Sequence, residues 1–305
     1  MNKIGYLAND RLRCIEGTMT FWDFLLHDIP GLIDMTGGYT PYYELAHNIE
    51  RAIKKQRPDY IIRNASYFRK INTNVPTISL LQDINLTDEC QHEVLNASTV
   101  VVANSQHTAN LYKDIIKTPV RIIPLGVDEQ LFKPGPDCSK ELGIGIGSIL
   151  FVGAATSIKG FSLLMDIVNS TAYNFVFVMK DDFKTDHPRI KVFNRADEQL
   201  MVKIYNSCKI VLCTSEQETQ HLTTLESWSC NLPTIGRRVG VYNEIADTVG
   251  WGLIANDLSD FIKAIRMTFE YIDCFKPRQF FLGKGFDMKT CMNRWKDLVQ
   301  EICYE

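Results

Sequence analysis

The sequence predicts an α/β protein with parallel sheets, divided into two domains. Strand-like apolar runs alternate with helix-like runs along the whole chain, a pattern typical of parallel sheets covered by helices. The length of 305 residues suits two domains of ordinary size. Residues 133–148 are rich in glycine and proline, and this break in the alternation indicates a domain boundary.

The first half of the chain contains four predicted strands, each a short run of apolar and β-branched residues. They cover residues 3–7, 60–63, 77–81 and 99–103. Apolar residues at helical spacing predict helices between them, over residues 18–27, 42–55, 88–96 and 105–115. Asn104 and Ser105 suit the N-cap of the last helix, because their side-chain oxygens accept hydrogen bonds from free backbone N–H groups.

The second half of the chain repeats this alternation. Its predicted strands lie near Ile149, Phe175, Lys191, Lys209, Pro233 and Gly252. Its predicted helices lie near Phe161, Glu198, Thr223, Tyr242 and Leu258. A last helix is predicted over residues 287–304, because apolar residues recur there on one helical face.

The composition indicates a soluble globular protein. Apolar residues make up 45% of the chain and charged residues 23%. The net charge of −3 argues against a dedicated nucleic-acid binder, and no apolar run reaches the roughly 18 to 20 residues of a membrane span. The first apolar stretch is too short for a signal peptide. The nine cysteines form no Cys-x-x-Cys pair, which favours reduced thiols in the cytoplasm and argues against a structural metal.

Two glutamates, Glu218 and Glu226, straddle a predicted strand-to-helix junction. The strand-like run 209–214 precedes them, and the helix-like run 222–230 begins between them. Backbone N–H groups are unpaired at a helix start, and such a start attracts phosphate. Carboxylates that hold sugar hydroxyls, next to amides that hold a diphosphate, suit a site for a nucleotide sugar.

This spacing resembles the Glu-x7-Glu motif of retaining glycosyltransferases with the two-domain GT-B fold, often called family 4 or glycosyl transferases group 1. Three further segments resemble the same family and occur in its order: 120–134 at the interdomain passage, 149–160 at the first donor-domain strand and phosphate loop, and 226–234 at a helix-to-strand passage. The resemblance extends from about residue 98 to residue 244 and is thin before and after.

The resemblance implies two Rossmann-like domains facing a cleft, with the C-terminal helix crossing back to the first domain. Residues 1–130 would form a shortened acceptor-side domain, completed by the helix 287–305. Residues 145–270 would form the donor domain, and 131–148 the linker.

The resemblance also implies transfer of a sugar from a nucleotide-diphosphate donor to a glycan, lipid or other hydroxyl acceptor, with retention. The chain lacks an Asp-x-Asp motif, so basic side chains and helix dipoles would replace a metal ion. No cofactor is expected, since the UDP- or GDP-linked sugar is a substrate. The expected partners are this donor and a glycan or lipid-linked acceptor.

The family's motifs assign three residues to catalysis: Glu218 beside the donor sugar, Lys159 at the phosphates and Gln82 on the acceptor side. Gln82 stands where many members carry a titrating His, so general-base chemistry there is not expected. The expected donor-binding residues are Gly17, Gly153, Lys159, Asn194, Arg195, Glu218, His221, Leu222, Thr223 and Glu226.

Three departures from the family leave an alternative open. Ala154 and Ala155 stand where members carry an Arg, so Arg237, Arg238 or Arg195 substitutes, the donor is bound differently, or activity is weak. Gln82 replaces the usual His, and the acceptor-side domain is short. A non-catalytic nucleotide-sugar-binding or scaffold protein with the same fold is therefore the second interpretation. The bulkier residues 219–221 stand where the family has glycines, so the donor sugar does not follow from the resemblance.

Peripheral membrane contact is a further, weaker expectation. Lipid-linked acceptors are common in the family, and residues 54–57 and 113–121 are basic. Each run is short and interrupted, so solvated faces are the preferred interpretation.

Overall fold

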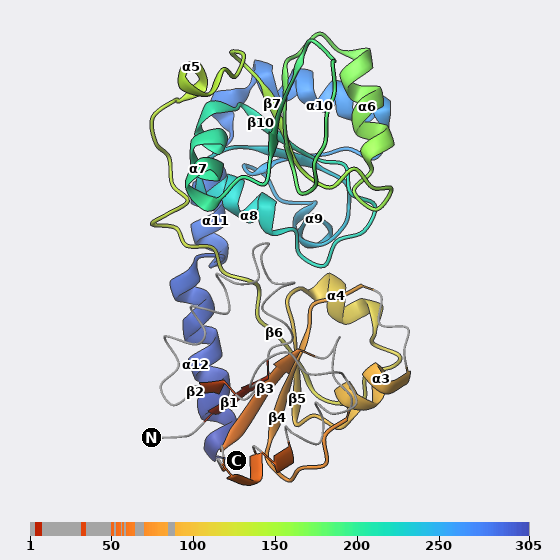
Figure 1. Cartoon of the computed structure of the whole chain (residues 1–305), viewed down its shortest axis with the longest axis vertical. Coiled ribbons are helices and arrows are strands. Elements are labelled where there is room, and N and C mark those ends of the chain that lie inside the picture. Colours follow the sequence, from red (N-terminus) through yellow and green to blue (C-terminus); the bar gives the residue numbers. More distant parts are fainter. Residues whose placement is uncertain are drawn as a thin grey trace. The chain divides into compact units, whose positions relative to one another are not determined.

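The computed structural model describes residues 4–7, 32–34, 50–51, 53–55, 57, 59–64, 70–84 and 89–304. The chain divides into two compact units, each drawn in Figure 1. Unit 1 is Met1–Gly126 with Lys289–Glu305, and unit 2 is Val127–Met288. Each unit contains a six-stranded sheet in which all paired strands are parallel, so the predicted α/β class is confirmed.

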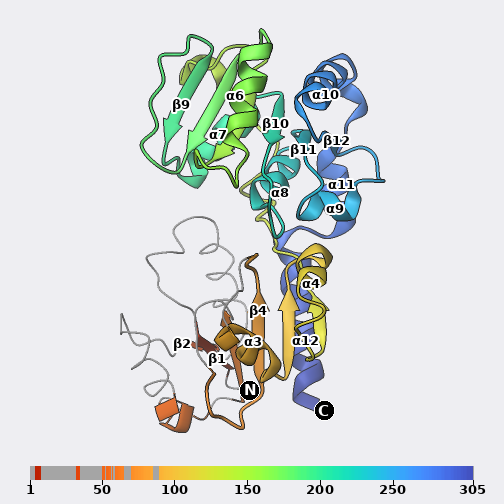
Figure 2. The same cartoon turned by 90° about the vertical axis from the view of Figure 1, so that its right-hand side faces the viewer.

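The sheet of unit 1 has the order β2-β1-β3-β4-β5-β6. Its strands are β1 (Ile4–Leu7), β2 (Leu32–Asp34), β3 (Tyr60–Asn64), β4 (Thr77–Leu81), β5 (Val100–Ala103) and β6 (Val120–Ile122). The four predicted strands of this half are therefore present, and β2 and β6 extend the sheet at its two edges. Figure 2 shows the strands from β2 at the left to β5 nearer the middle of the view.

The described helices of unit 1 are α3 (Glu89–Asn96), α4 (Gln106–Leu111) and α12 (Met288–Tyr304), and residues 50–51 and 53–55 are also helical. Helices α3 and α12 agree with their predicted ranges to within one residue, whereas α4 ends at Leu111 instead of residue 115. Residues 42–49 of the predicted helix 42–55 lie outside the described residues. Ser105 caps α4 as expected, and its side chain accepts from the backbone N–H of Thr108. The predicted helix 18–27 lies outside the described residues.

Helix α12 returns from unit 2 to unit 1, as the resemblance implied. Its apolar face, including Cys291 and Trp295, is buried. The thiol of Cys291 lies 3.1 Å from the carbonyl oxygen of Pro124, and Arg121 Nη2 lies 2.5 Å from Glu301 Oε1. These contacts join helix α12 to strand β6 and to Pro124, which follows that strand.

The sheet of unit 2 has the order β12-β11-β10-β7-β8-β9, which Figure 2 shows spread from right to left. Its strands are β7 (Ile149–Gly153), β8 (Phe175–Met179), β9 (Ile190–Asn194), β10 (Ile210–Cys213), β11 (Thr234–Gly236) and β12 (Gly252–Ile254). All six lie at the predicted places. Strands β8 and β10 are buried along their whole length, as expected for the interior of a parallel sheet.

Helices cover both faces of this sheet. Successive residues of a strand point to opposite faces, so neighbouring apolar residues of one strand pack into two different layers. Ile149 and Phe151 of β7 pack with α6 (Phe161–Ser170) and α10 (Leu258–Glu270). Leu150, between them in sequence, packs in the opposite layer with α7 (Glu198–Ser207), α8 (Leu222–Ser229) and α11 (Pro277–Lys284). A short helix, α9 (Val241–Ile245), follows β11.

The glycine- and proline-rich stretch belongs to unit 2. The boundary between the units falls between Gly126 and Val127, before the segment 131–148 that the sequence marked as a linker. Within that segment α5 (Ser139–Leu142) forms, and Gly135 N donates to Asn206 Oδ1 of α7 at 2.7 Å. The segment is therefore tied to the body of unit 2.

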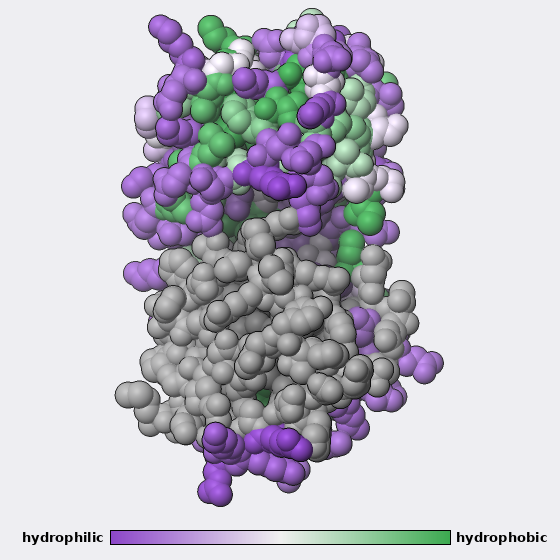
Figure 3. Space-filling view, in the orientation of Figure 1, coloured by the Kyte–Doolittle hydropathy of each residue, from purple (hydrophilic) through white to green (hydrophobic). Residues whose placement is uncertain are grey.

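Among the described helices, none combines the length and apolar character needed to cross a membrane. Figure 3 shows one face of the molecule. In this view hydrophilic residues (purple) dominate the part of unit 2 where Figure 1 labels α8 and α9.

Candidate functional site

The candidate site lies where β7 and β10 end. These strands are parallel neighbours, so the loops that follow them emerge at the same edge of the sheet. Glu216 N donates to the carbonyl oxygen of Ile158 at 2.8 Å, and Thr214 Oγ1 donates to that of Lys159 at 2.8 Å. The two loops are thus fixed to each other.

Gly160 explains how closely these loops approach. It has a φ of 62° and caps the start of α6. A Cβ atom at this position would lie 2.0 Å from the carbonyl oxygen of Thr214, so no side chain fits. Glycine is therefore needed both for the backbone conformation and for the contact.

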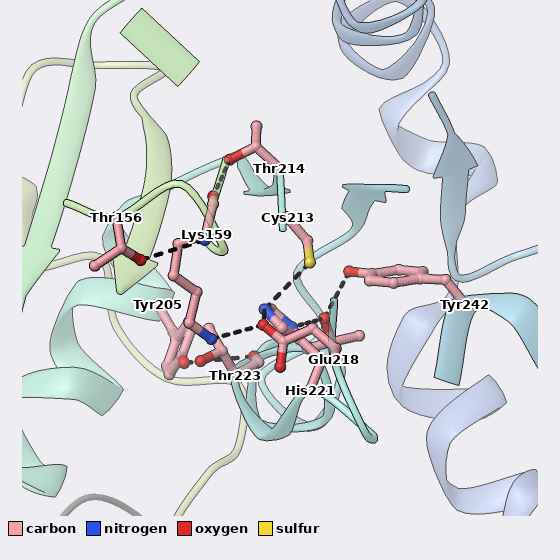
Figure 4. Close-up of polar contacts among 10 residues, drawn as sticks. Thr156, Lys159, Tyr205, Cys213, Thr214, Glu218, His221, Thr223 and Tyr242 are labelled. Atoms are coloured by element: carbon pink, nitrogen blue, oxygen red, sulfur yellow. Dashed lines mark hydrogen bonds and ion pairs between the residues drawn. The ribbon is translucent and has the colours of Figure 1, made fainter. Parts of the chain in front are cut away.

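Lys159 and Glu218 meet between the two loops. Lys159 Nζ lies 2.6 Å from Glu218 Oε1, and their side chains are 31% and 13% exposed. Burial opposes ionisation of Glu218, but the imidazole of His221 in its protonated form at low pH, the charge of Lys159 and the hydrogen bonds from Lys159 and Ser215 outweigh it, so the pKa of this carboxyl lies below its ordinary value. The structure therefore brings together two residues that the sequence assigned to catalysis (Figure 4).

His221 stands at the N-cap of α8 with a φ of 77°, a left-handed conformation that is rare for a residue other than glycine. Its side chain is 5% exposed. The ring nitrogen Nδ1 lies 2.6 Å from Thr224 Oγ1, and Nε2 lies 3.1 Å from Cys213 Sγ and 3.6 Å from Glu218 Oε1. Burial lowers the pKa of His221 to about 4, although Glu218 acts in the opposite direction, so the imidazole is neutral at pH 7.

Glu226 lies one turn into α8. The hydroxyl of Tyr205, on α7, donates to Glu226 Oε2 at 2.7 Å. Burial raises the pKa of Glu226 to about 7, and the hydrogen bond from Tyr205 opposes that rise. This carboxyl therefore changes its charge near neutral pH.

The loop after β11 closes against Glu218 from another side. Gly240 has a φ of 52°, and a Cβ atom there would lie 3.1 Å from the Gln220 backbone and from Glu218 Cβ. Val241 N donates to the carbonyl oxygen of Gln220 at 3.1 Å. Loops from three neighbouring strands thus fix the position of Glu218.

The two candidate residues at the end of β9 have local partners. Asn194 accepts from the backbone N–H of Phe183 and donates to its carbonyl oxygen, both at 3.2 Å. Arg195 has a φ of 58° and lies 3.7 Å from Asp182, with both side chains largely exposed.

Three other residues that the sequence assigned to donor binding lie at the strand end and at the helix start that were predicted for them. Gly153 ends β7, and Leu222 and Thr223 begin α8. The carbonyl oxygen of Thr223 accepts from Tyr205 at 3.4 Å.

The remaining candidates are less closely tied to the site. Gln82 follows β4 in unit 1 and is half-buried, whereas Gly17 lies outside the described residues. Arg237 pairs with Glu216 at 3.5 Å, and Arg238 pairs with Asp247 at 3.6 Å. Of the three arginines proposed to replace the missing one, Arg237 is therefore joined to the loop that carries Glu218.

Sequence reasoning did not identify Tyr205, Thr224 or Tyr242 as part of this site. Tyr205 follows Met201 and Ile204 at the spacing of a buried helical face, which predicts only a core role. Thr224 and Tyr242 are fully buried polar residues whose partners come from other elements. Nothing in the local sequence distinguishes them from core residues.

The described residues contain no group of three or more His, Cys, Asp or Glu side chains placed to hold a metal ion.

Comparison with known proteins agrees with this arrangement. Residues 147–270 match the family described as glycosyl transferases group 1. The chain is 24% identical over 220 residues to an uncharacterized glycosyltransferase, MJ1178, of Methanocaldococcus jannaschii. That match covers 67% of this chain and 60% of the relative, so the chain spans less than two thirds of that protein.

Solved structures share the fold over almost the whole chain. Sucrose-phosphate synthase of Thermosynechococcus elongatus superposes with a TM-score of 0.81 at 14% identity and covers 98% of this chain and 99% of its own. HepE of Anabaena, solved with UDP, gives 0.78 at 16% identity and covers 98% and 100%. A glycosyltransferase of Rickettsia africae gives 0.75 at 17% identity and covers 100% and 99%.

The two units have the GT-B fold that these solved structures share. Residues 147–270, within the second unit, are similar to the glycosyl transferases of group 1.

Proposed function

We propose that the chain transfers a sugar from a nucleotide-diphosphate donor to a hydroxyl group, with retention at the anomeric carbon and without a metal ion. The observation that carries the proposal is the contact of Lys159 with Glu218 beside the start of α8. One cation, one carboxylate and a helix start meet there, and these groups match a diphosphate joined to a sugar.

Each residue then has a chemical role. The Lys159 ammonium and the α8 dipole offset charge on the departing diphosphate, and stabilising that charge lowers the barrier. The carboxylate of Glu218 accepts hydrogen bonds from donor-sugar hydroxyls, and that of Glu226 accepts them from the ribose. A phosphate oxygen of the leaving group takes the acceptor proton, because Gln82 cannot titrate.

UDP is the first nucleotide to test. HepE of Anabaena has been solved with UDP and with UDP-glucose, and this supports a UDP-linked donor over a GDP-linked one. Backbone groups near residues 192–198 would contact the base. The acceptor is proposed to be a glycan or a lipid-linked glycan that engages Gln82 and unit 1, with weak peripheral membrane contact in the lipid-linked case.

We also infer a cytoplasmic location and no resident cofactor. The six described cysteines with placed side chains form no disulfides, which fits a reducing compartment.

Thermal-shift measurements in EDTA against UDP, GDP, ADP and their common sugar conjugates test the proposal. A ligand that binds only the folded state stabilises it by about 2.7 kcal/mol at a hundredfold excess over Kd. One nucleotide should raise the melting temperature, and one of its sugar conjugates should raise it further. Glu226→Ala should abolish both shifts, and a protein that responds to no nucleotide would refute the proposal.

The second candidate is a nucleotide-sugar-binding protein without transfer. Lys159 has Glu218 as its partner, and Ala154 and Ala155 leave the phosphate loop without an arginine. This candidate would be favoured if the protein binds the donor but releases no nucleotide, both with glycan or lipid-linked acceptors present and with water as the only acceptor.

A further inference from the structure

We propose that His221 is a positioning residue: buried hydrogen bonds through Thr224 and Tyr242 hold its imidazole, and the Nε2–H group then faces the carboxylate of Glu218 and orients it. The inference rests on the proposed role of Glu218 beside the donor sugar. His221 itself is too buried to contact a substrate, so it acts through the carboxylate.

The backbone conformation of His221 is the first observation. A φ of 77° costs a residue with a Cβ atom on the order of 1 kcal/mol, and glycine would avoid that cost. The backbone alone therefore gives no reason for histidine at this position. The reason for histidine at this strained position is its imidazole, which has polar partners at both ring nitrogens.

The buried partners of His221 form a continuous chain. Its Nδ1 lies 2.6 Å from Thr224 Oγ1, which lies 2.6 Å from the Tyr242 hydroxyl. Figure 4 labels His221 and Tyr242. All three side chains are at most 7% exposed, so each polar group needs a partner within the protein.

The carboxylate end of the chain sets its direction, because Nε2 of His221 faces Glu218. The ionised carboxylate of Glu218, at the far end, can only accept.

Between the two ends the protons follow one order. Tyr242 then donates to Thr224, and Thr224 donates to Nδ1 of His221. The ring proton therefore lies on Nε2, which faces Cys213 Sγ at 3.1 Å and Glu218 Oε1 at 3.6 Å. The opposite tautomer would point a nitrogen lone pair at a carboxylate.

This arrangement has a use when the donor binds. Lys159 is the other charged group that faces His221 and Glu218. When Lys159 binds the diphosphate, its positive charge is shared between the ligand and Glu218. The Nε2–H dipole of His221 then holds the carboxylate in place without adding a second charge to the site.

The first test is spectroscopic and needs no donor. Long-range proton–nitrogen correlation spectra of protein labelled at histidine nitrogens, with the His221 signals assigned by their loss in His221→Gly, should show the Nε2–H form from pH 6 to 8. Thr224→Val should convert it to a mixture of tautomers. Thr268→Val is the matched control, since Thr268 is equally buried and bonds only to the carbonyl of Ala264 in its own helix. The Nδ1–H form or an imidazolium in the unsubstituted protein would overturn the inference.

The second test separates positioning from general damage. Glycine fits the φ of residue 221, so His221→Gly should fold, and any change in its affinity for free nucleotide measures general damage to the site. Its affinity for the sugar conjugate should fall about tenfold further than its affinity for the nucleotide, because Glu218 is left without the imidazole that faces it. Equal affinity of both proteins for the sugar conjugate would overturn the inference. If the unsubstituted protein binds no nucleotide, the proposed function fails, and the spectra still decide the tautomer.

Discussion

At the scale of single residues, burial controls the charge of the site. Glu218 and Glu226 are both enclosed by unit 2, yet their pKa values move in opposite directions. Glu218 has Lys159 beside it, whereas Glu226 accepts from the neutral hydroxyl of Tyr205 and is repelled by the charge of Glu198. Desolvation therefore has the largest effect on the pKa of Glu226.

Donor affinity should therefore depend on pH near neutrality. A protonated Glu226 accepts hydrogen bonds poorly, so nucleotide affinity should rise from pH 6 to pH 8 and level off above the pKa of about 7. Calorimetric titrations at constant ionic strength measure this profile. Tyr205→Phe should shift its midpoint to higher pH, because the hydrogen bond that lowers the pKa is lost. A flat profile in the unsubstituted protein would contradict the assignment of Glu226 to the ribose.

The same carboxyl should make stability depend on pH. Its pKa is about 7 in the folded state and 4.5 as its reference value, so between these values the folded state holds a proton that the unfolded state has released. Stability from this group is thus complete below about pH 4.5 and declines as pH rises to about 7, by on the order of 3 kcal/mol. Glu226→Gln should raise the melting temperature at pH 8. Glu270→Gln, an exposed change at the end of α10, serves as the control and should leave it unchanged.

At the scale of elements, the loops after β7 and β10 depend on close backbone contact. Gly160→Ala would place a methyl group against the Thr214 carbonyl and should lower stability by about 2 kcal/mol or more while weakening nucleotide binding. Gly283→Ala, inside α11 with open space around it, should instead stabilise the protein by about 1 kcal/mol. Melting temperatures of the two variants measure the contrast, and equal losses would contradict this account of the loop.

The sequence predicted the strands of unit 2 well for a physical reason. Strands buried on both faces are continuous apolar runs, and their pattern is visible without knowledge of their neighbours. Edge strands β2 and β6 have three residues each and give too short a signal. Helix α4 ends at Leu111, earlier than its apolar spacing suggested, because the following residues form turns.

The site was predictable only in part. Glu218, Glu226 and Lys159 stand next to recognisable strand ends, so their proximity follows from parallel topology. The chain from Tyr242 through Thr224 to His221 joins α9 to the start of α8. Such partners depend on how elements pack, and no local spacing encodes them. The sequence shows that residues 219–221 replace the family's glycines, but it does not show how these residues pack in the structure.

At the scale of the whole molecule, Arg278 joins the start of unit 2 to its interior. Its guanidinium donates to the carbonyl oxygens of Ser229, of Phe132 at 3.2 Å and of Glu129 at 3.2 Å. The helix end at α8, the first loop of the unit and α11 are therefore held by one side chain. Only arginine offers several donors in a fixed plane for such a junction.

Arg278→Lys should lower the stability of unit 2 by about 2 kcal/mol, since a lysine keeps the charge but cannot reach three carbonyls at once. Proteolytic cleavage within unit 2, measured at increasing denaturant concentrations, would report the loss of stability. Arg266→Lys, an exposed change on α10, is the matched control. Equal resistance of Arg278→Lys and the unsubstituted protein would show that the junction does not depend on the guanidinium.

Unit 2 also begins and ends at one place. Val127 N donates to the carbonyl oxygen of Phe286 at 3.0 Å, and Met288 N donates to that of Val127 at 2.9 Å. The unit is thus a continuous cassette whose two junctions adjoin, while unit 1 is assembled from two separated stretches of chain. A gene segment for residues 127–288 can be exchanged for that of a relative through two cuts that meet in space, and such an exchange would test whether this unit alone sets the proposed donor preference.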